Sequence, residues 1–86
     1  MDFVIFKNKH ARYRKEDFGG LVLTNNFLYL LNESEYDLLD KINKKKYMKN
    51  SDLNKNELEI VKKFLYNQIL FQLDFEKANK IINQKS

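Results

Sequence analysis

The chain has 86 residues, a formal net charge of +4, no cysteine and one histidine, His10. This length predicts a single domain with a small core. Without cysteine the chain cannot form disulfides, iron–sulfur clusters or thiolate zinc sites, and His10 cannot build a metal site unaided, so we expect no cofactor. No apolar run approaches the ~20 residues of a membrane span, and the first residues do not resemble a signal peptide, so we expect a cytoplasmic protein without membrane contact.

The first half of the chain favours strands. Strands are predicted at residues 11–15, 21–24 and 27–31, because these runs are bounded by residues typical of turns. Residues 16–19 suit a turn, since glycine tolerates positive φ. Asn25-Asn26 suits a two-residue hairpin loop, because asparagine visits the left-handed region at low cost.

The hairpin loop fixes a register that the structure can test. Leu23 should face Leu28, and Leu21 should face Leu30, so these four leucines share one face of the sheet. We expect that leucine face to pack on the core. The opposite face carries Val22, Thr24, Phe27 and Tyr29 and is expected to be partly exposed.

Two helix starts share one pattern. Asn32 with Glu35, and Asn54 with Glu57, each have the spacing of a capping box. Helices are therefore predicted at residues 33–43 and 55–68, with apolar side chains at helical spacing. A short helix is expected within residues 44–52.

The end of the chain predicts two further elements. Residues 69–73 are consistent with a closing strand or an extended segment. Phe75, Ala78, Ile81 and Ile82 fit an amphipathic tail helix capped by Asp74. The expected fold is α+β and similar to a winged helix-turn-helix, with a three-stranded antiparallel sheet followed by three helices. Residues 1–73 would form one domain, and residues 74–86 would form the tail helix.

No group of residues carries a catalytic signature. His10 lies in a polar, basic stretch and is interpreted as exposed. Asp37 and Asp40 could form a carboxylate pair, but solvated charges on a helix are far commoner. Gly19-Gly20 lacks the spacing and the lysine of a phosphate-binding loop. We therefore expect a binding protein without enzymatic activity.

Two modes of binding are open. A winged-helix protein with a basic surface could bind DNA, although Glu57 and Glu59 near the start of the last helix would repel phosphates, so we do not expect a nucleic-acid partner. Alternatively, an extended peptide could pair with the edge strand at residues 27–31, which carries no lysine or proline to protect it. Such an edge is either covered by the protein itself or free for a partner, and the residues alone leave both open.

The order of these motifs resembles the RiPP recognition element, best known as the small chaperone of pyrroloquinoline quinone biosynthesis. The resemblance spans about residues 11–73 and rests on an arginine-bearing strand (Arg12, Arg14), the hairpin at residues 21–31, the Leu31-Asn32-Glu33 helix start and the apolar segment at residues 65–70. The pattern R-x-x-x-F-G-G-L-V from Arg14 to Val22 is similar to the binding protein of mycofactocin biosynthesis. Residues 44–52 are shorter and more basic than the family's second helix, and residues 75–86 have no counterpart.

The resemblance implies a specific function. Such domains bind the leader of a ribosomally made precursor peptide by strand addition and present it to a separate modifying enzyme, here a radical SAM maturase. The implied edge consists of Phe27, Leu28, Tyr29, Leu30 and Leu31. The implied facing wall consists of Val61, Lys62, Phe64, Leu65 and Gln68, and Lys62 and Lys63 would steer an acidic leader. The alternatives are a small winged-helix DNA-binding protein and a homodimer formed through the tail.

Overall fold

The computed structural model describes residues 3–24 and 27–74. These residues form six strands, two α-helices and one 3-10 helix. In chain order the elements are β1 (Phe3–Lys7), β2 (Arg12–Glu16), β3 (Gly19–Leu23), β4 (Leu28–Leu31), α1 (Glu33–Lys45), β5 (Met48–Lys49), η1 (Asn50–Asp52), α2 (Lys55–Tyr66) and β6 (Leu70–Asp74).

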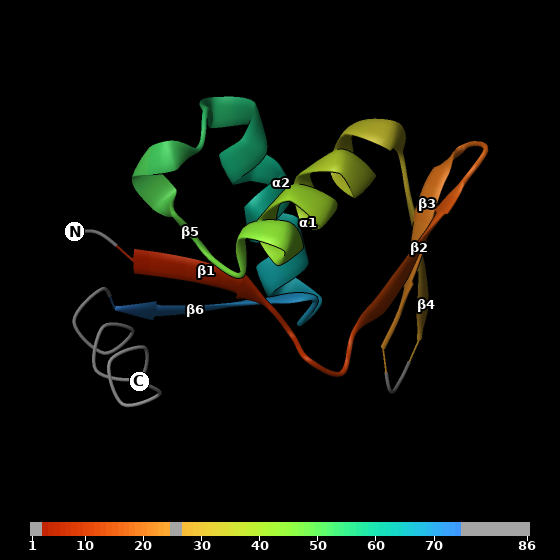
Figure 1. Cartoon of the computed structure of the whole chain (residues 1–86), viewed down its shortest axis with the longest axis horizontal. Helices are drawn as coiled ribbons and strands as arrows, with labels where there is room; N and C mark the ends of the chain where they lie inside the picture. Colours follow the sequence, from red (N-terminus) through yellow and green to blue (C-terminus); the bar gives the residue numbers. More distant parts are fainter. Residues whose placement is uncertain (1–2, 25–26, 75–86) are drawn as a thin grey trace.

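The strands form two antiparallel sheets with helix α1 between them (Figure 1). One sheet has the order β5-β1-β6, so the first and last described strands are neighbours. The other sheet has the order β2-β3-β4. Helix α1 packs against both β1 and β3, and α2 packs against β6. The described part of the chain contains no helix that is long and apolar enough to cross a membrane.

A single core joins the two sheets and the helices. Its fully buried side chains come from nearly every element, because α1 and α2 each bury one apolar face. The largest of them are Phe64, Ile5, Leu31, Leu39, Ile42, Ile69, Leu70, Val22 and Val61.

The predicted fold, a single three-stranded sheet followed by three helices as in a winged helix-turn-helix, is wrong. Two segments account for the difference. Residues 3–7 form β1, which pairs with β6 more than 60 positions later in the chain, for example Ile5 with Gln72. Residues 48–52 form β5 and η1 in place of a middle helix, because Met48 pairs with Ile5 and is buried against the core. The closing strand predicted at residues 69–73 is confirmed as β6.

The predicted hairpin register is confirmed, but the predicted faces are reversed. Leu23 pairs with Leu28 and Leu21 with Leu30, as expected. However, Leu28 and Leu30 are 57% and 62% exposed, whereas Val22 on the opposite face is completely buried. The leucine face therefore points away from the core.

The junction between β4 and α1 explains this reversal. Leu31 is the last residue of β4 and is buried, directly before the cap of α1 at Asn32. Side chains alternate along a strand, so the face that holds Leu31 also holds Tyr29 and, across the ladder, Val22. Helix α1 covers that face, and the four leucines are left on the other side.

The two capping boxes are confirmed. The amide of Glu35 donates to the side chain of Asn32, and the Asn32 amide donates to the carboxylate of Glu35, both at 2.8 Å. Asn54 and Glu57 make the same pair of bonds at the start of α2. Helix α2 ends at Tyr66, two residues before the predicted end, and Gln68 follows with φ of 61°. Asp74, the expected cap of a tail helix, is the last residue of β6, and the predicted tail helix and tail-mediated dimer lie outside the described residues.

Candidate functional site: an open sheet edge beside helix α2

Strand β4 forms one edge of its sheet, because no other described strand pairs with its outer side. The amide of Thr24 donates to the carbonyl oxygen of Phe27 at 3.0 Å, which closes the hairpin. Bonded and non-bonded pairs alternate along an antiparallel ladder, so Val22 and Tyr29 form the next bonded pair. The backbone groups of Leu28 and Leu30 therefore point outward, to the open edge.

The predicted edge residues fall on both faces of the sheet. Phe27, Leu28 and Leu30 are exposed, Tyr29 is half-buried and Leu31 belongs to the core. The rings of Phe27 and Tyr29 contact each other edge to face, with centroids 6.1 Å apart. The edge thus offers backbone groups at Leu28 and Leu30 and an aromatic pair beside them.

The predicted wall on α2 divides into buried and exposed positions. Val61 and Phe64 are buried in the core, and Leu65 is half-buried, so the apolar stripe of α2 faces inward. Lys62 is exposed on α2, and Gln68, which lies beyond the end of α2, is exposed as well. The structure therefore does not bring the predicted wall residues together on one surface.

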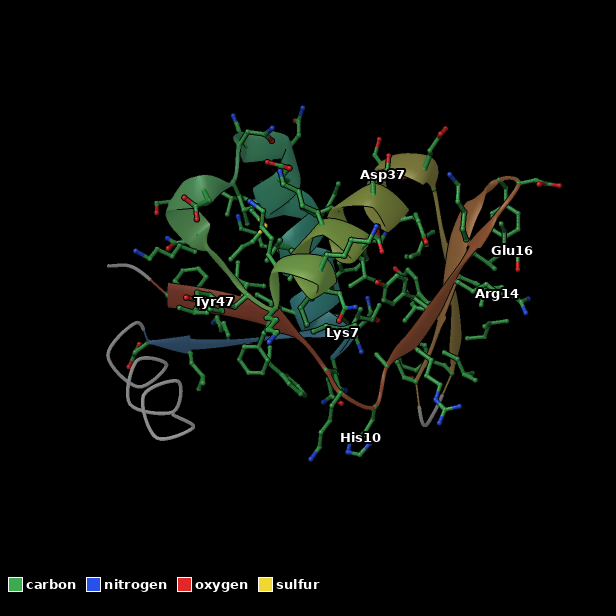
Figure 2. All side chains as sticks on the ribbon, viewed as in Figure 1. Lys7, His10, Arg14, Glu16, Asp37 and Tyr47 are labelled. Carbon is green, nitrogen blue, oxygen red and sulfur yellow. The ribbon has the colours of Figure 1, made fainter. Side chains whose placement is uncertain are left out.

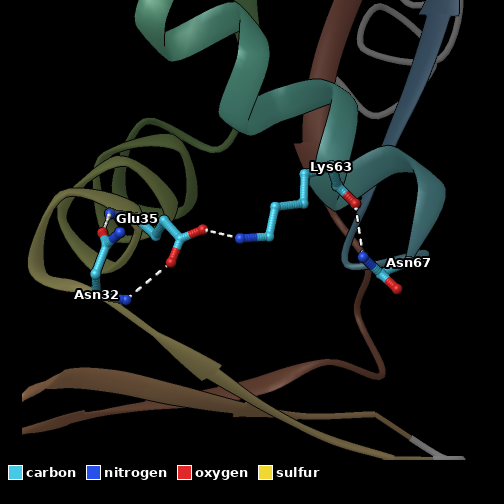
Figure 3. A network of polar contacts seen from close by, with 4 residues as sticks. All are labelled: Asn32, Glu35, Lys63 and Asn67. Carbon is cyan, nitrogen blue, oxygen red and sulfur yellow. Dashed lines mark hydrogen bonds and ion pairs between the residues drawn. The ribbon is translucent and has the colours of Figure 1, made fainter.

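The side chain of Lys63 on α2 contacts Tyr29 on β4. Its ammonium nitrogen lies 5.5 Å from the centroid of the Tyr29 ring and 2.5 Å from the Oε2 atom of Glu35 (Figure 3). Glu35 is buried, and its other oxygen accepts the Asn32 amide of the capping box. The Glu35 carboxylate thus completes the capping box of α1 and also pairs with Lys63 of α2, which lies over Tyr29 of β4.

The pKa of Lys63 is raised, first because its ammonium group donates a hydrogen bond to Glu35, while partial burial acts in the opposite direction. Lys62, the other predicted steering residue, lies 3.6 Å from Glu59 on the exposed side of α2. Both lysines therefore have an acidic partner within the chain. The attraction that they can offer to an acidic peptide is weaker than their charges alone indicate.

Tyr66 is a candidate contact that the sequence patterns did not identify. It follows Lys63 by three positions on α2, so the two side chains are neighbours on the helix surface. Its side chain is 87% exposed, the largest exposure among the exposed large hydrophobic residues of the described chain. The sequence did hold one signal for it. Tyr66 lies outside the apolar stripe of α2, whereas the other aromatic residue of the helix, Phe64, lies within it and is buried.

The candidate acid–base residues Asp37, Asp40 and His10 are either exposed or bonded to neighbouring side chains. Asp40 accepts hydrogen bonds from the hydroxyl of Tyr13 at 2.8 Å and pairs with Lys44 at 2.9 Å. The hydrogen bond from Lys44, followed by that from Tyr13, lowers the pKa of the Asp40 carboxyl. Asp37 is exposed on α1, and His10 is exposed in the connection between β1 and β2 (Figure 2). Within residues 3–24 and 27–74, no three His, Asp or Glu side chains gather as metal ligands would.

The DNA-binding alternative depended on a helix-turn-helix. The described residues contain two α-helices, and β5 with η1 occupies the segment that would hold the middle helix. Glu57 and Glu59, the acidic residues near the start of α2, are each ion-paired with a lysine of the chain. The alternative therefore loses the fold on which it was based.

Comparisons with known proteins identify no similar protein. No protein-family model matches the chain, and neither a curated protein nor a solved structure is significantly similar to it.

Proposed function

We propose that this protein is a non-catalytic peptide-binding module that takes up an extended peptide at the edge of β4. The observation that carries the proposal is the open edge itself, with outward-facing backbone groups at Leu28 and Leu30. Lys63 of α2 lies over Tyr29 of β4, so an added strand would run near the exposed side of α2. Tyr66 on that side would contact the side chains of the peptide.

The resemblance to the RiPP recognition element supplies the class of ligand. Under this proposal the ligand is the leader of a ribosomally made precursor peptide. A separate modifying enzyme, such as a radical SAM maturase, then acts on the rest of that precursor. The protein itself contributes capture and presentation.

Amide hydrogen exchange tests the binding mode without any mutation. In the free protein the amide of Tyr29 should exchange slowly, because it donates within the ladder, and the amides of Leu28 and Leu30 should exchange fast. The probes are synthetic leader peptides from short reading frames that neighbour this gene. A bound peptide should slow exchange at Leu28 and Leu30 while leaving Tyr29 unchanged. Binding that leaves both outward amides unprotected would contradict strand addition.

A proline substitution tests the same edge by affinity. Leu30→Pro removes one outward amide and should weaken binding at least about tenfold, because a hydrogen bond of the ladder is lost and the ring obstructs the added strand. Leu30→Ala keeps the amide and is the matched control, with an expected change of less than about threefold. Equal affinity of a folded Leu30→Pro variant and the wild type would reject the proposal.

A further inference from the structure

The outer face of the β2-β3-β4 sheet is arranged in two parallel rows. Arg12 pairs across the sheet with Leu23, which pairs with Leu28. Arg14 pairs with Leu21 in the same way, and Leu21 pairs with Leu30. Each row therefore begins with an arginine on β2 and continues with two leucines.

This face is open to solvent. Leu23, Leu28 and Leu30 are each about half exposed or more, at 49%, 57% and 62%. An open hollow of about 390 Å³ lies on the face, lined by the two arginines, Tyr13, Leu21, Leu23 and Leu28. Helix α1 covers the inner face of the same sheet, and no described element covers the outer one. Contiguous exposed apolar surface of this kind marks an interaction site.

The dimensions of the face fit one α-helix. Three strands about 4.8 Å apart span ~10 Å, which is the diameter of a helix with its side chains. Layered folds cover an apolar sheet face with helices, as α1 already does on the inner side. A helix on the outer side would give the sheet a helical layer on both faces.

The arginines define the charge of that helix. Arg12 and Arg14 are two residues apart on β2, a separation of ~6.8 Å, which two carboxylates at positions i and i+4 of a helix match at ~6 Å. Arg14 lies 2.6 Å from Glu16 on the same face (Figure 2), and Arg12 forms no ion pair with any described residue. A guanidinium has five donors, so Arg14 can donate hydrogen bonds to a second carboxylate as well as to Glu16.

We propose that this face docks an acidic amphipathic helix of a partner protein. The apolar stripe of the partner helix covers Leu21, Leu23, Leu28 and Leu30, and its carboxylates pair with Arg12 and Arg14. Charge argues against two other possible occupants of this face, a second copy of the chain and the chain's own residues 75–86. A second copy would bring the same arginines and its own net charge of +4, and residues 75–86 carry Lys77, Lys80 and Lys85 against a single acidic residue, Glu76. The inference concerns the face of the sheet and does not depend on the peptide proposed for its edge.

Two designed helical peptides with the same leucine stripe test the proposal. One peptide carries glutamates at i and i+4 beside the stripe, and the other carries lysines there. Titrated into the full-length protein with labelled methyl groups, the glutamate peptide should shift the Leu21, Leu23, Leu28 and Leu30 signals. The lysine peptide should bind about tenfold more weakly or not at all.

Charge reversal makes the test specific. The double variant Arg12→Glu/Arg14→Glu should reverse the preference and favour the lysine peptide. Leu23→Ser, on the central strand, should weaken binding of both peptides, whereas Phe71→Ser on β6 of the other sheet is the matched control and should change neither. Equal binding of the two peptides, or unchanged binding by the charge-reversed protein, would overturn the proposal. Self-association in sedimentation that Leu23→Ser abolishes would instead assign the face to a second copy and would also overturn it.

The two proposals fail separately. Tyr66→Ser should weaken binding of a leader peptide at the β4 edge but leave the leucine shifts caused by the glutamate peptide unchanged, because Tyr66 lies on α2 and outside the leucine face. Arg12→Glu/Arg14→Glu should leave the protection of the Leu28 and Leu30 amides by a leader peptide intact. A loss confined to one assay therefore rejects only the proposal that the assay addresses.

Discussion

Gly20 shows at the level of one residue how α1 approaches the sheet. A Cβ atom added at Gly20 would lie 2.4 Å from the Cδ1 atom of Tyr36, which belongs to α1. At the neighbouring Gly19 a Cβ would meet the carbonyl oxygen of Leu31 at the same distance, and φ there is +144°. The glycine pair therefore allows both the turn after β2 and the close packing of α1.

We predict that Gly20→Ala destabilises the protein by about 1–3 kcal/mol, because the added methyl group overpacks the contact with Tyr36. Urea unfolding measures the free energy. Lys15→Ala, at the position paired with Gly20 in the ladder, is the control and should cost less than about 0.5 kcal/mol. In a Tyr36→Ala background the cost of Gly20→Ala should shrink, since the clashing ring is gone. An undiminished cost in that background would contradict the contact as the cause.

At the level of elements, the Glu35–Lys63 pair connects the two helices. Glu35 has a side-chain exposure of 7%, whereas Lys63 has 46%, so the carboxylate is largely withdrawn from water while its partner is half solvated. The same carboxylate completes the capping box of α1. Glu35 therefore has two roles. Its role as a cap of α1 could be predicted from the sequence, whereas its ion pair with Lys63 of α2 could not.

A comparison of two caps measures this second role. Glu35→Gln removes the charge that faces Lys63, and we expect it to cost about 1–2 kcal/mol. Glu57→Gln is the matched control, because Glu57 fills the same position of the α2 capping box but its ion pair with Lys41 is longer, at 3.8 Å. Chemical denaturation compares the two, and a Lys63→Met cycle isolates the coupling. Equal costs for the two glutamates would indicate that Glu35 acts only as a cap.

At the level of the whole molecule, shifted pKa values predict how stability depends on pH. The pKa of Asp40 is lowered from its ordinary 3.8, mainly by the hydrogen bond from Lys44, so its contribution is full above that value and is lost as pH falls through the folded pKa. The pKa of Lys63 is raised from 10.5 by its hydrogen bond to Glu35, and that of Tyr13 is raised from 10.0, chiefly by burial. Their contributions are full below those values and are lost as pH rises.

Stability should therefore be highest between about pH 4 and pH 10 and decline on both sides. Thermal unfolding followed across this range provides the curve. Asp40→Asn should flatten the decline below pH 4, because the substituted side chain no longer titrates, and it should lower the plateau by about 1 kcal/mol through weaker hydrogen bonding. If Asp40→Asn and the wild type lose stability equally below pH 4, other carboxylates cause that loss.

Local patterns decided much of this protein. The two capping boxes, the strand order in the hairpin sheet and the pairing of Leu23 with Leu28 all follow from residues close together in the chain, because caps and two-residue turns are local interactions. The candidate edge at β4 was identified for the same reason. Its outward backbone groups at Leu28 and Leu30 also follow from that register.

Contacts between distant segments decided the rest. Residues 3–7 form β1 by pairing with β6, and residues 48–52 form β5 and η1 beside β1. Hydrophobicity alone predicted that the four leucines face the core. Helix α1 instead packs on the opposite face, which holds Leu31 at the end of β4 and Gly20, where the missing side chain leaves room for Tyr36. Composition ranks how apolar each face of a strand is, whereas the side on which a helix packs depends on side-chain alternation, the length of the connection and available space.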